Sequence, residues 1–346
     1  MLGGLSFLAA ALYWPGTISP SETPRFALLA LIPFLLRGFQ VTSAHTAGLL
    51  FIAWAVASLF WTPAPLDAIN ALLVLFILGC CFCLGSQIEN MRPVYIGAAL
   101  GLSLSSVIAI AQWLGYHPLP KMTAISGLFV NGNFMAEAAA LIVVALVAER
   151  IWWAVPMVLP ALVLPLARGA MLACAVSLLL NFRHRREFWI VLAAVPLVAA
   201  AYIAAKGVDL SSVNDRFGIW QATLANVTMF GHGLGSFRFL FPSIDIRILA
   251  SSSPEFTHNE FLFVAFELGA VGLALFLAFC LTLAGPLDTA RLVLIALFVE
   301  MCLEFPTHLP TTGFVGLVAA GHAVRNRYVL RDFFVRGRRI SGAGLA

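Results

Sequence analysis

Long apolar runs, separated by proline, glycine or charged residues, divide the chain along its length. They lie at 2–15, 25–37, 44–61, 66–85, 94–115, 133–149, 151–166, 169–182, 188–206, 259–282, 290–304 and 311–324. A helix needs about 20 mostly apolar residues to cross the hydrocarbon core of a bilayer. We therefore predict an all-α, polytopic membrane helix bundle of about twelve transmembrane helices, or ten or eleven if short runs merge, with 1–346 as one integral-membrane domain.

Two segments fall outside this pattern. Residues 207–258 are predicted to form one large loop on the non-cytoplasmic side, and 325–346 a basic cytoplasmic tail. A loop this long in a compact protein is usually functional or disordered, and this one is too aromatic for simple disorder. We expect it to lie against the membrane surface or to cap a cavity, on the evidence of Phe217, Trp220, Phe230, Phe237, Phe239 and Phe241.

The composition agrees with a membrane protein. Hydrophobic residues make up 61% of the chain and charged residues 10%, whereas a soluble domain carries about 25% charged residues. A water-soluble enzyme is therefore excluded, and the lipid bilayer is the expected partner. The net charge of +4 is small and scattered, so no nucleic acid partner is expected.

The basic residues predict the orientation, because cytoplasmic loops carry the excess of Lys and Arg. With twelve spans, both termini and thirteen of the 20 basic residues are cytoplasmic, including the clusters at 183–186 and 325–339. The other seven lie outside: Arg25, Lys121, Arg168, Lys206, Arg216, Arg238 and Arg247.

Arg168 and Arg216 are the main candidates for binding an anion. Arg168 stands where one apolar run ends and the next begins, and a guanidinium there is costly unless an anion meets it. The planar guanidinium suits bidentate contacts with phosphate. We therefore predict a diphosphate clamp, with Arg238 or Arg247 as helpers. The alternative is that these arginines reach toward lipid head groups or pair with acidic residues, namely Asp215, Asp245 or Glu255.

A second constellation begins at His258, where the long loop meets an apolar run. An imidazole there can act as a general base or orient a hydroxyl. Gly269 and Gly272 follow in the same run and would let a neighbouring helix approach closely. Glu267 is a polar contact inside the run, with holding the helix in register as the favoured role.

Three weaker signals are present. The glycines of 231–235 predict a tight turn, since the flanking features of a nucleotide-binding loop are absent. Asn133 is placed to cap the helix of the sixth run. Glu300 and Glu304 are four residues apart on one side of their run, where a carboxylate pair could relay protons or line the acceptor side of a cavity.

Taken together, these motifs resemble the O-antigen ligase and O-antigen polymerase family of bacterial membrane glycosyltransferases. The shared features are Gly127 to Asn133, Ala167 to Ala170, Arg216 with Trp220, Gly231 to Phe237, and His258-Asn259 followed by Gly269 and Gly272. The second half is the more specific, because the spacing from His-Asn to the two glycines is similar to the ligase signature.

The resemblance implies a GT-C-like fold in the bacterial inner membrane. It also implies an inverting, metal-independent transfer of a glycan from a polyprenyl-diphosphate carrier to an acceptor at the periplasmic face, without a cofactor. His258, Arg216 and Arg168 take the catalytic roles by position. The residues expected to bind substrate are Arg238, Arg247, Asn133, Trp220 and Asn259.

The acceptor stays open at this point. Lipid A core, as in an O-antigen ligase, is the leading expectation. A growing lipid-linked glycan, as in a repeat-unit polymerase, or a protein hydroxyl, as in a protein O-oligosaccharyltransferase, would use the same donor. A secondary transporter is the alternative from another class, since it would also use many spans and buried carboxylates, although no inverted repeat is apparent.

Overall fold

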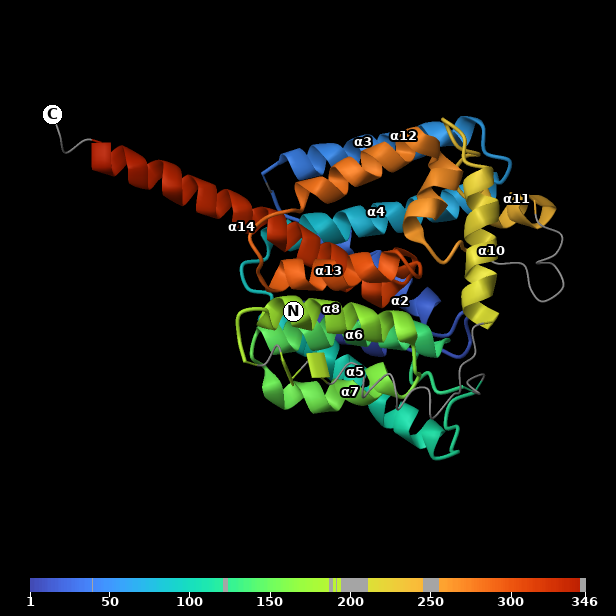
Figure 1. The fold of residues 1–346 in the computed structure, drawn as a ribbon, viewed down its shortest axis with the longest axis horizontal. Coiled ribbons are helices and arrows are strands. Elements are labelled where there is room, and N and C mark those ends of the chain that lie inside the picture. Colours follow the sequence, from blue (N-terminus) through green and yellow to red (C-terminus); the bar gives the residue numbers. More distant parts are fainter. Residues whose placement is uncertain are drawn as a thin grey trace.

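The computed structural model describes residues 1–38, 40–120, 124–186, 189–190, 192–193, 211–244 and 255–342. In this part of the chain every regular element is helical, which confirms the predicted all-α class. Most helices lie side by side in a bundle, with α10 across one end of it (Figure 1).

Most helices of the bundle overlap one of the predicted runs, although several are shorter than the run. Those of the bundle are α1 (Leu2–Ala11), α2 (Glu22–Leu29), α3 (Ser43–Ala57), α4 (Pro65–Gln87), α5 (Arg92–Trp113), α6 (Gly132–Ala148), α7 (Val155–Val163), α8 (Arg168–Phe182), α12 (Glu260–Thr282), α13 (Thr289–Met301) and α14 (Pro310–Gly342). Short 3-10 turns adjoin them at η1 (Ile32–Leu35), η2 (Ser58–Phe60), η3 (Trp152–Ala154) and η5 (Pro306–His308).

Within the described ranges, four helices are long and apolar enough to cross a membrane. They cover Ser43–Phe60, Pro65–Gln87, Arg92–Trp113 and Glu260–Thr282. The second predicted run is divided between α2 and η1, and α2 has only 8 residues, too few to span a bilayer. Most of the ninth run, 188–206, lies outside the described residues. The count of twelve spans therefore stays a prediction.

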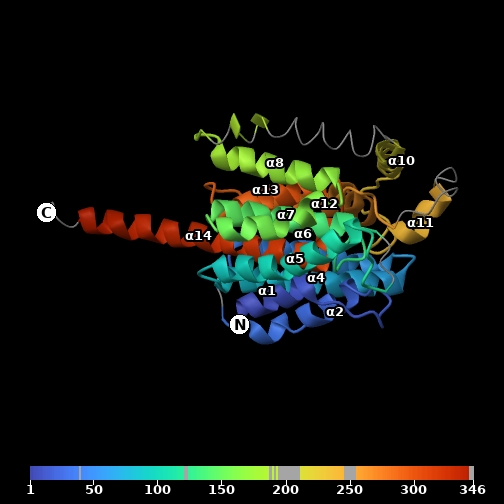
Figure 2. The ribbon, with the colours of Figure 1, turned by 90° about the horizontal axis from the view of Figure 1, so that it is seen from below.

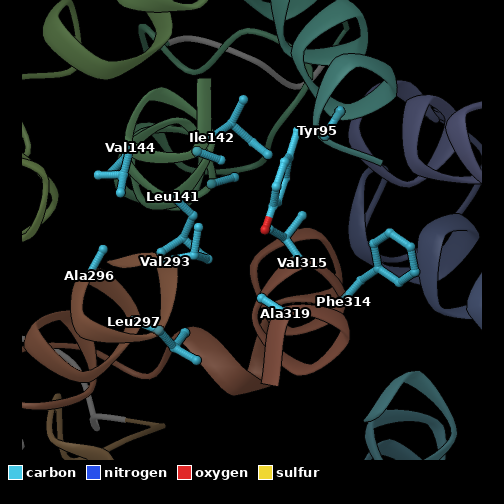
Figure 3. Close-up of a cluster of buried hydrophobic side chains, with 14 of the residues drawn as sticks. Tyr95, Leu141, Ile142, Val144, Val293, Ala296, Leu297, Phe314, Val315 and Ala319 are labelled. Atoms are coloured by element: carbon cyan, nitrogen blue, oxygen red, sulfur yellow. The ribbon is translucent and has the colours of Figure 1, made fainter. Parts of the chain in front are cut away.

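The core forms where α5, α6, α13 and α14 meet. Tyr95, Ile142, Val293 and Val315 come from these four helices and point toward one another (Figure 3). Every residue of α6 from Met135 to Val147 is buried. Small side chains let such helices approach closely. A Cβ on Gly85 of α4, for example, would lie 2.1 Å from the carbonyl oxygen of Val318 in α14.

Arg25 has a structural role inside the bundle. Its side chain is buried and donates hydrogen bonds to the carbonyl oxygens of Leu12 and Leu128 and to the hydroxyl of Thr311, at 2.9–3.1 Å. The guanidinium carbon also lies 3.9 Å from the ring centroid of Phe129. These contacts satisfy the guanidinium inside the protein, so Arg25 has a structural role wherever it lies relative to the membrane.

The two ends of the bundle differ. At one end, α14 extends beyond the other helices and carries the predicted basic tail as far as residue 342 in helical form (Figure 2). Here Arg325 pairs with Glu89 at 2.7 Å, and the backbone N–H of Arg37 donates to Gln87. The other end is covered by α10 (Ser211–Ala225) and α11 (Phe237–Ile244) (Figure 1).

The segment predicted as one large loop, 207–258, thus contains two helices. Phe237 and Phe241 of α11 are buried against Phe266 of α12, whereas Phe217 and Phe239 are exposed. The aromatic residues of segment 207–258 therefore have two different surroundings. Some of the rings pack the segment against the bundle, and others are exposed on its surface.

Candidate functional site

Glu304 joins Arg216 and His258 at the end of the bundle that α10 covers. It follows the end of α13, where its backbone N–H donates to the Glu300 carbonyl at 2.7 Å. Arg216 of α10 pairs with Oε1 of Glu304 and donates a second hydrogen bond to the Leu303 carbonyl, at 3.0 Å. The Glu304 side chain is 8% exposed and that of Arg216 is 24% exposed. About a quarter of the Arg216 side chain thus stays accessible, while the Glu304 carboxylate is nearly enclosed.

His258 contacts the other oxygen of the same carboxylate. Its Nδ1 lies 2.7 Å from Oε2 of Glu304. Because an ionised carboxylate only accepts hydrogen bonds, we assign the proton of the neutral ring to Nδ1. This tautomer leaves the lone pair on Nε2, which suits a general base whose orientation is fixed by a carboxylate.

The backbone holds His258 in an uncommon conformation. Its φ is 51°, in the left-handed region that non-glycine residues seldom adopt. On one side, the Thr257 hydroxyl donates to the Asn259 carbonyl at 2.5 Å, and on the other, the Asn259 side chain caps α12 by accepting from Leu262 N–H at 3.0 Å. Strained residues of this kind persist where the surroundings fix them.

Asn259 and Trp220, both predicted to bind substrate, make hydrogen bonds within the protein. Asn259 Nδ2 donates to the Cys302 carbonyl at 3.0 Å, which ties the start of α12 to the end of α13. Trp220 Nε1 donates to the Thr257 carbonyl at 2.9 Å. Both side chains therefore position His258, and direct contact with substrate stays a prediction.

Phe305 supplies an apolar wall beside the histidine. Its ring stacks on Phe256 at 4.2 Å between centroids and lies 5.4 Å from the His258 ring. On its far side it meets Phe134 of α6 at 5.7 Å. Such a wall reduces the access of water to one side of the imidazole.

Arg168 and Asn133 lie on helix starts that reach the same region. Arg168 is exposed at the first turn of α8, and a Cβ on the next residue, Gly169, would lie 4.0 Å from Glu304 Cγ. The start of α6 meets the site through Phe134. However, the residue that caps α6 is Asn131, which accepts from Asn133 N–H at 2.9 Å. The expectation that Asn133 caps this helix is therefore wrong, because it stands inside the first turn.

The other two candidate arginines stand apart from this cluster. Arg238 of α11 pairs with Glu255 at 3.1 Å, and both side chains are more than half exposed. This is one of the acidic partners that the alternative interpretation named. Arg247 lies outside the described residues.

Two further carboxyl groups are buried behind Glu304. Glu137 of α6 and Glu300 of α13 are almost inaccessible, and their carboxyl oxygens have no hydrogen-bond partner among the described residues. Both lie within electrostatic reach of Glu304. Burying a charged group without a partner is costly, so two buried carboxyl groups without hydrogen-bond partners among the described residues are an unusual feature.

Gly269 breaks α12, and the glycine-rich segment fills the break. Gly269 has φ 72° and ψ −173°, which is not helical. A Cβ there would lie 2.3 Å from the Gly231 nitrogen. The expectation that a helix approaches Gly269 is therefore wrong, because a loop lies there. Gly272 does face a helix, since Trp54 of α3 lies beside it.

Hydrogen bonds satisfy the backbone at this break. Ala270 and Val271 donate to the Thr228 and Met229 carbonyls at 3.1 and 3.2 Å. In return, His232 and Gly233 donate to the Phe266 and Glu267 carbonyls, at 3.1 and 2.8 Å. Irregular backbone within a membrane-length helix is tolerated where protein supplies such partners.

The Glu267 side chain anchors the same loop. Its two oxygens accept from the backbone N–H groups of Gly235 and Phe237 at 2.9 and 3.0 Å. The segment 231–235 makes the expected tight turns, with positive φ at all three glycines. Glu267 therefore joins α12 to the start of α11, which is a structural role as predicted, although it fixes a loop and not the register of a helix.

A separate polar group lies near the start of α12. Glu260 Oε1 accepts from the Thr307 hydroxyl at 2.5 Å and lies 3.2 Å from His308 Nε2. Burial by itself would lower the pKa of His308, but the neighbouring Glu260 carboxylate outweighs it, and the pKa is raised above its usual value. This histidine was not among the predicted site residues.

The sequence pointed to Arg216 and His258 but not to their common partner. Glu304 was recognised only as one of a carboxylate pair with an undetermined role. The signal that could have found it was its position, because it ends an apolar run on the side of the membrane where Arg216 and His258 were placed.

No protein-family model matches the chain, and no curated protein sequence matches it.

Proposed function

We propose that the protein is a membrane glycosyltransferase that moves a glycan from a polyprenyl-diphosphate carrier to an acceptor hydroxyl. The observation that carries this proposal is the bridge made by Glu304 between Arg216 and His258. It places a cation suited to a diphosphate leaving group beside a base suited to a hydroxyl. The motif resemblance to the O-antigen ligases and polymerases points to the same chemistry.

In the proposed reaction, the acceptor hydroxyl attacks the anomeric carbon of the glycan. The bond from that carbon to the carrier diphosphate breaks with inversion, and the hydroxyl proton passes to Nε2 of His258. Arg216 and Arg168 stabilise the negative charge on the departing diphosphate. Since this leaving group is already good, charge stabilisation and placement of one hydroxyl account for most of the catalysis needed.

The proposed location is the bacterial inner membrane, with about twelve spans, both termini in the cytoplasm and the site at the periplasmic face. The position of the basic tail favours this orientation. The site lies at the α10 end of the bundle, opposite the end where α14 projects with its basic tail. Arg325 is also at that projecting end, as the excess of positive charge on cytoplasmic loops requires.

The leading acceptor is lipid A core, and the same donor site would serve a repeat-unit polymerase or a protein O-oligosaccharyltransferase. A transporter is the second candidate function. It is favoured by Glu137 and Glu300, which are buried and lack hydrogen-bond partners among the described residues, because buried carboxyls in membrane segments often carry protons.

Purified protein in lipid nanodiscs tests the proposal. It is given polyprenyl-diphosphate-linked glycan together with lipid A core, a pilin-like protein or no second acceptor. We expect product with one of the three, and a loss of about 10²-fold in rate for Arg216→Ala and for His258→Ala. Arg168→Ala should weaken the reaction in the same direction.

Arg92→Ala is the matched control, since Arg92 is exposed and is expected on the cytoplasmic side; its rate should equal that of the wild type. Absence of product with all three acceptors, together with proton-coupled solute uptake in proteoliposomes that requires Glu137 and Glu300, would replace the transferase with the transporter.

A further inference from the structure

An apolar groove runs between α3, α4 and α12 and is distinct from the Glu304 site. Its volume is about 410 Å³. Leu49 of α3 and Phe76 of α4 line it and are each more than half exposed, so the groove opens at the outer surface of the bundle. All three helices belong to the group that is long and apolar enough to cross a membrane. A hydrocarbon chain is therefore the kind of group that fits along it.

The polar lining is concentrated near the start of α12. Glu260, Glu267, Thr307 and His308 line the groove there, and His45 near the start of α3 lines it as well. Among the described residues, neither lysine nor arginine lines it. A diphosphate or phosphate head group would therefore meet two carboxylates, of which Glu260 is paired with His308 and Glu267 is bound by backbone N–H groups.

One oxygen of this polar end lacks a partner. The Glu260 side chain is buried, and its Oε1 contacts Thr307 and His308. Its Oε2 has no hydrogen-bond partner in the described part of the chain. Both oxygens of Glu267, in contrast, are used by Gly235 and Phe237. A buried carboxylate oxygen without a donor is costly, and a ligand head group that donates hydrogen bonds would satisfy it.

We propose that this groove binds a bilayer lipid with a primary ammonium head group, of the ethanolamine type, through Glu260. The ammonium supplies a charge-assisted hydrogen bond to Oε2, and one acyl chain occupies the apolar length of the groove. This inference is independent of the proposed transferase reaction. It also distinguishes the groove from a site for the carrier lipid, because a diphosphate group lacks the N–H donors that Oε2 of Glu260 would accept from.

A comparison of lipid head groups in detergent tests the proposal. Delipidated protein is titrated with phosphatidylethanolamine, with its trimethylated choline analogue and with phosphatidylglycerol, and bound lipid is counted by native mass spectrometry. We expect one retained ethanolamine lipid, with affinity at least about tenfold above that of the other two. The choline head keeps the positive charge but has no N–H donor, so it isolates the hydrogen bond.

Two variants locate the site. Glu260→Gln removes the charge, and Gly79→Leu fills the groove, because a Cβ on Gly79 lies 3.6 Å from Ile52 Cδ1 without a clash. Each should reduce the affinity for the ethanolamine lipid about tenfold. Gly218→Leu is the control, since Gly218 of α10 has open space around it and lies outside the groove.

A photo-crosslinking acyl chain on the ethanolamine lipid should label Leu75 or Phe276, which line the groove. Equal affinity for all three head groups, tighter binding of a polyprenyl phosphate, or labelling elsewhere would overturn the proposal. The head-group comparison uses the wild-type protein and therefore tests the proposal even where a variant does not fold.

Discussion

His258 and Glu304 are 46 positions apart in the sequence, yet their side chains meet at 2.7 Å between Nδ1 and Oε2. The histidine lies just before the start of α12, and the glutamate lies just after the end of α13. Since Glu304 also binds Arg216, one carboxylate fixes the orientation of both a cation and a base.

Replacing Glu304 should therefore disturb both Arg216 and His258. In Glu304→Gln the amide keeps the shape of the side chain but loses the charge that attracts Arg216. Because one acceptor oxygen becomes an NH2 donor, the side chain can no longer accept from both Arg216 and His258. We expect a loss of about 10²-fold in turnover, measured as initial rate of glycan transfer with purified protein. The double variant with His258→Ala should lose little more than either single variant, since the two residues act as a unit.

Glu255→Gln is the matched control for that experiment. It removes a carboxylate from an exposed ion pair with Arg238, so its rate should be unchanged. Equal losses in Glu255→Gln and Glu304→Gln would show that the bridge has no special role.

Arg238→Ala should have little effect. Exposed ion pairs contribute about 0.2–1 kcal/mol, and the partner of Arg238 is the exposed Glu255. We expect the transfer rate and KM for the donor to change less than about twofold. An increase of tenfold or more in KM would instead establish Arg238 as a donor-binding residue, which is the role predicted for it from the sequence.

Gly269→Ala should prevent stable folding. Only glycine readily adopts φ 72° with ψ −173°, and such strain costs about 1–3 kcal/mol. The added Cβ would also meet Gly231 N at 2.3 Å and Met229 O at 2.4 Å. The expected result is loss of the monodisperse peak in size-exclusion chromatography, or a large fall in Tm in detergent.

Gly218→Ala makes the same chemical change in the helical segment of α10 with nothing within 4 Å of the new Cβ. Alanine is favoured over glycine in a helix by up to about 1 kcal/mol, so Tm should stay the same or rise slightly. A similar fall in both variants would contradict the role assigned to the break.

Stability should depend on pH through His308. The raised pKa means that the folded protein favours the protonated ring more than the unfolded chain does. The stabilisation is full below the unfolded pKa of about 6.5 and is lost as pH rises through the folded pKa. Glu260 and Glu267 are the charged groups that raise this pKa. Tm measured between about pH 5 and 9 should fall across this range, and Glu260→Gln should flatten the curve.

The helical class and most helix positions could be predicted because long apolar runs leave few other structures possible. Predictions failed where the answer depended on contacts distant in sequence. Asn131 and Asn133 are equally plausible caps from sequence, and only the backbone at the start of α6 decides between them. Arg25 looks like an exposed basic residue in the sequence, but it is buried because three acceptors from distant segments surround it.

The candidate site, too, could be predicted only in part from the sequence. Arg216 and His258 could be chosen from residue type and position, since both stand near the ends of apolar runs on one side. Their shared partner could not, because the match of Glu304 to both depends on how α10, α12 and α13 are placed in space. The break at Gly269 was also missed, since a glycine within an apolar run does not show by itself that a distant loop satisfies the backbone there.

The exchange of hydrogen bonds at that break limits how the protein can be divided or recombined. Segment 228–233 supplies partners to α12 and receives partners from it, so neither has a complete set of backbone contacts alone. A chimera that takes segment 228–233 from a related protein should therefore take α12 from the same protein. For engineering or evolution, these two stretches behave as one inherited module, although α11 lies between them in the sequence.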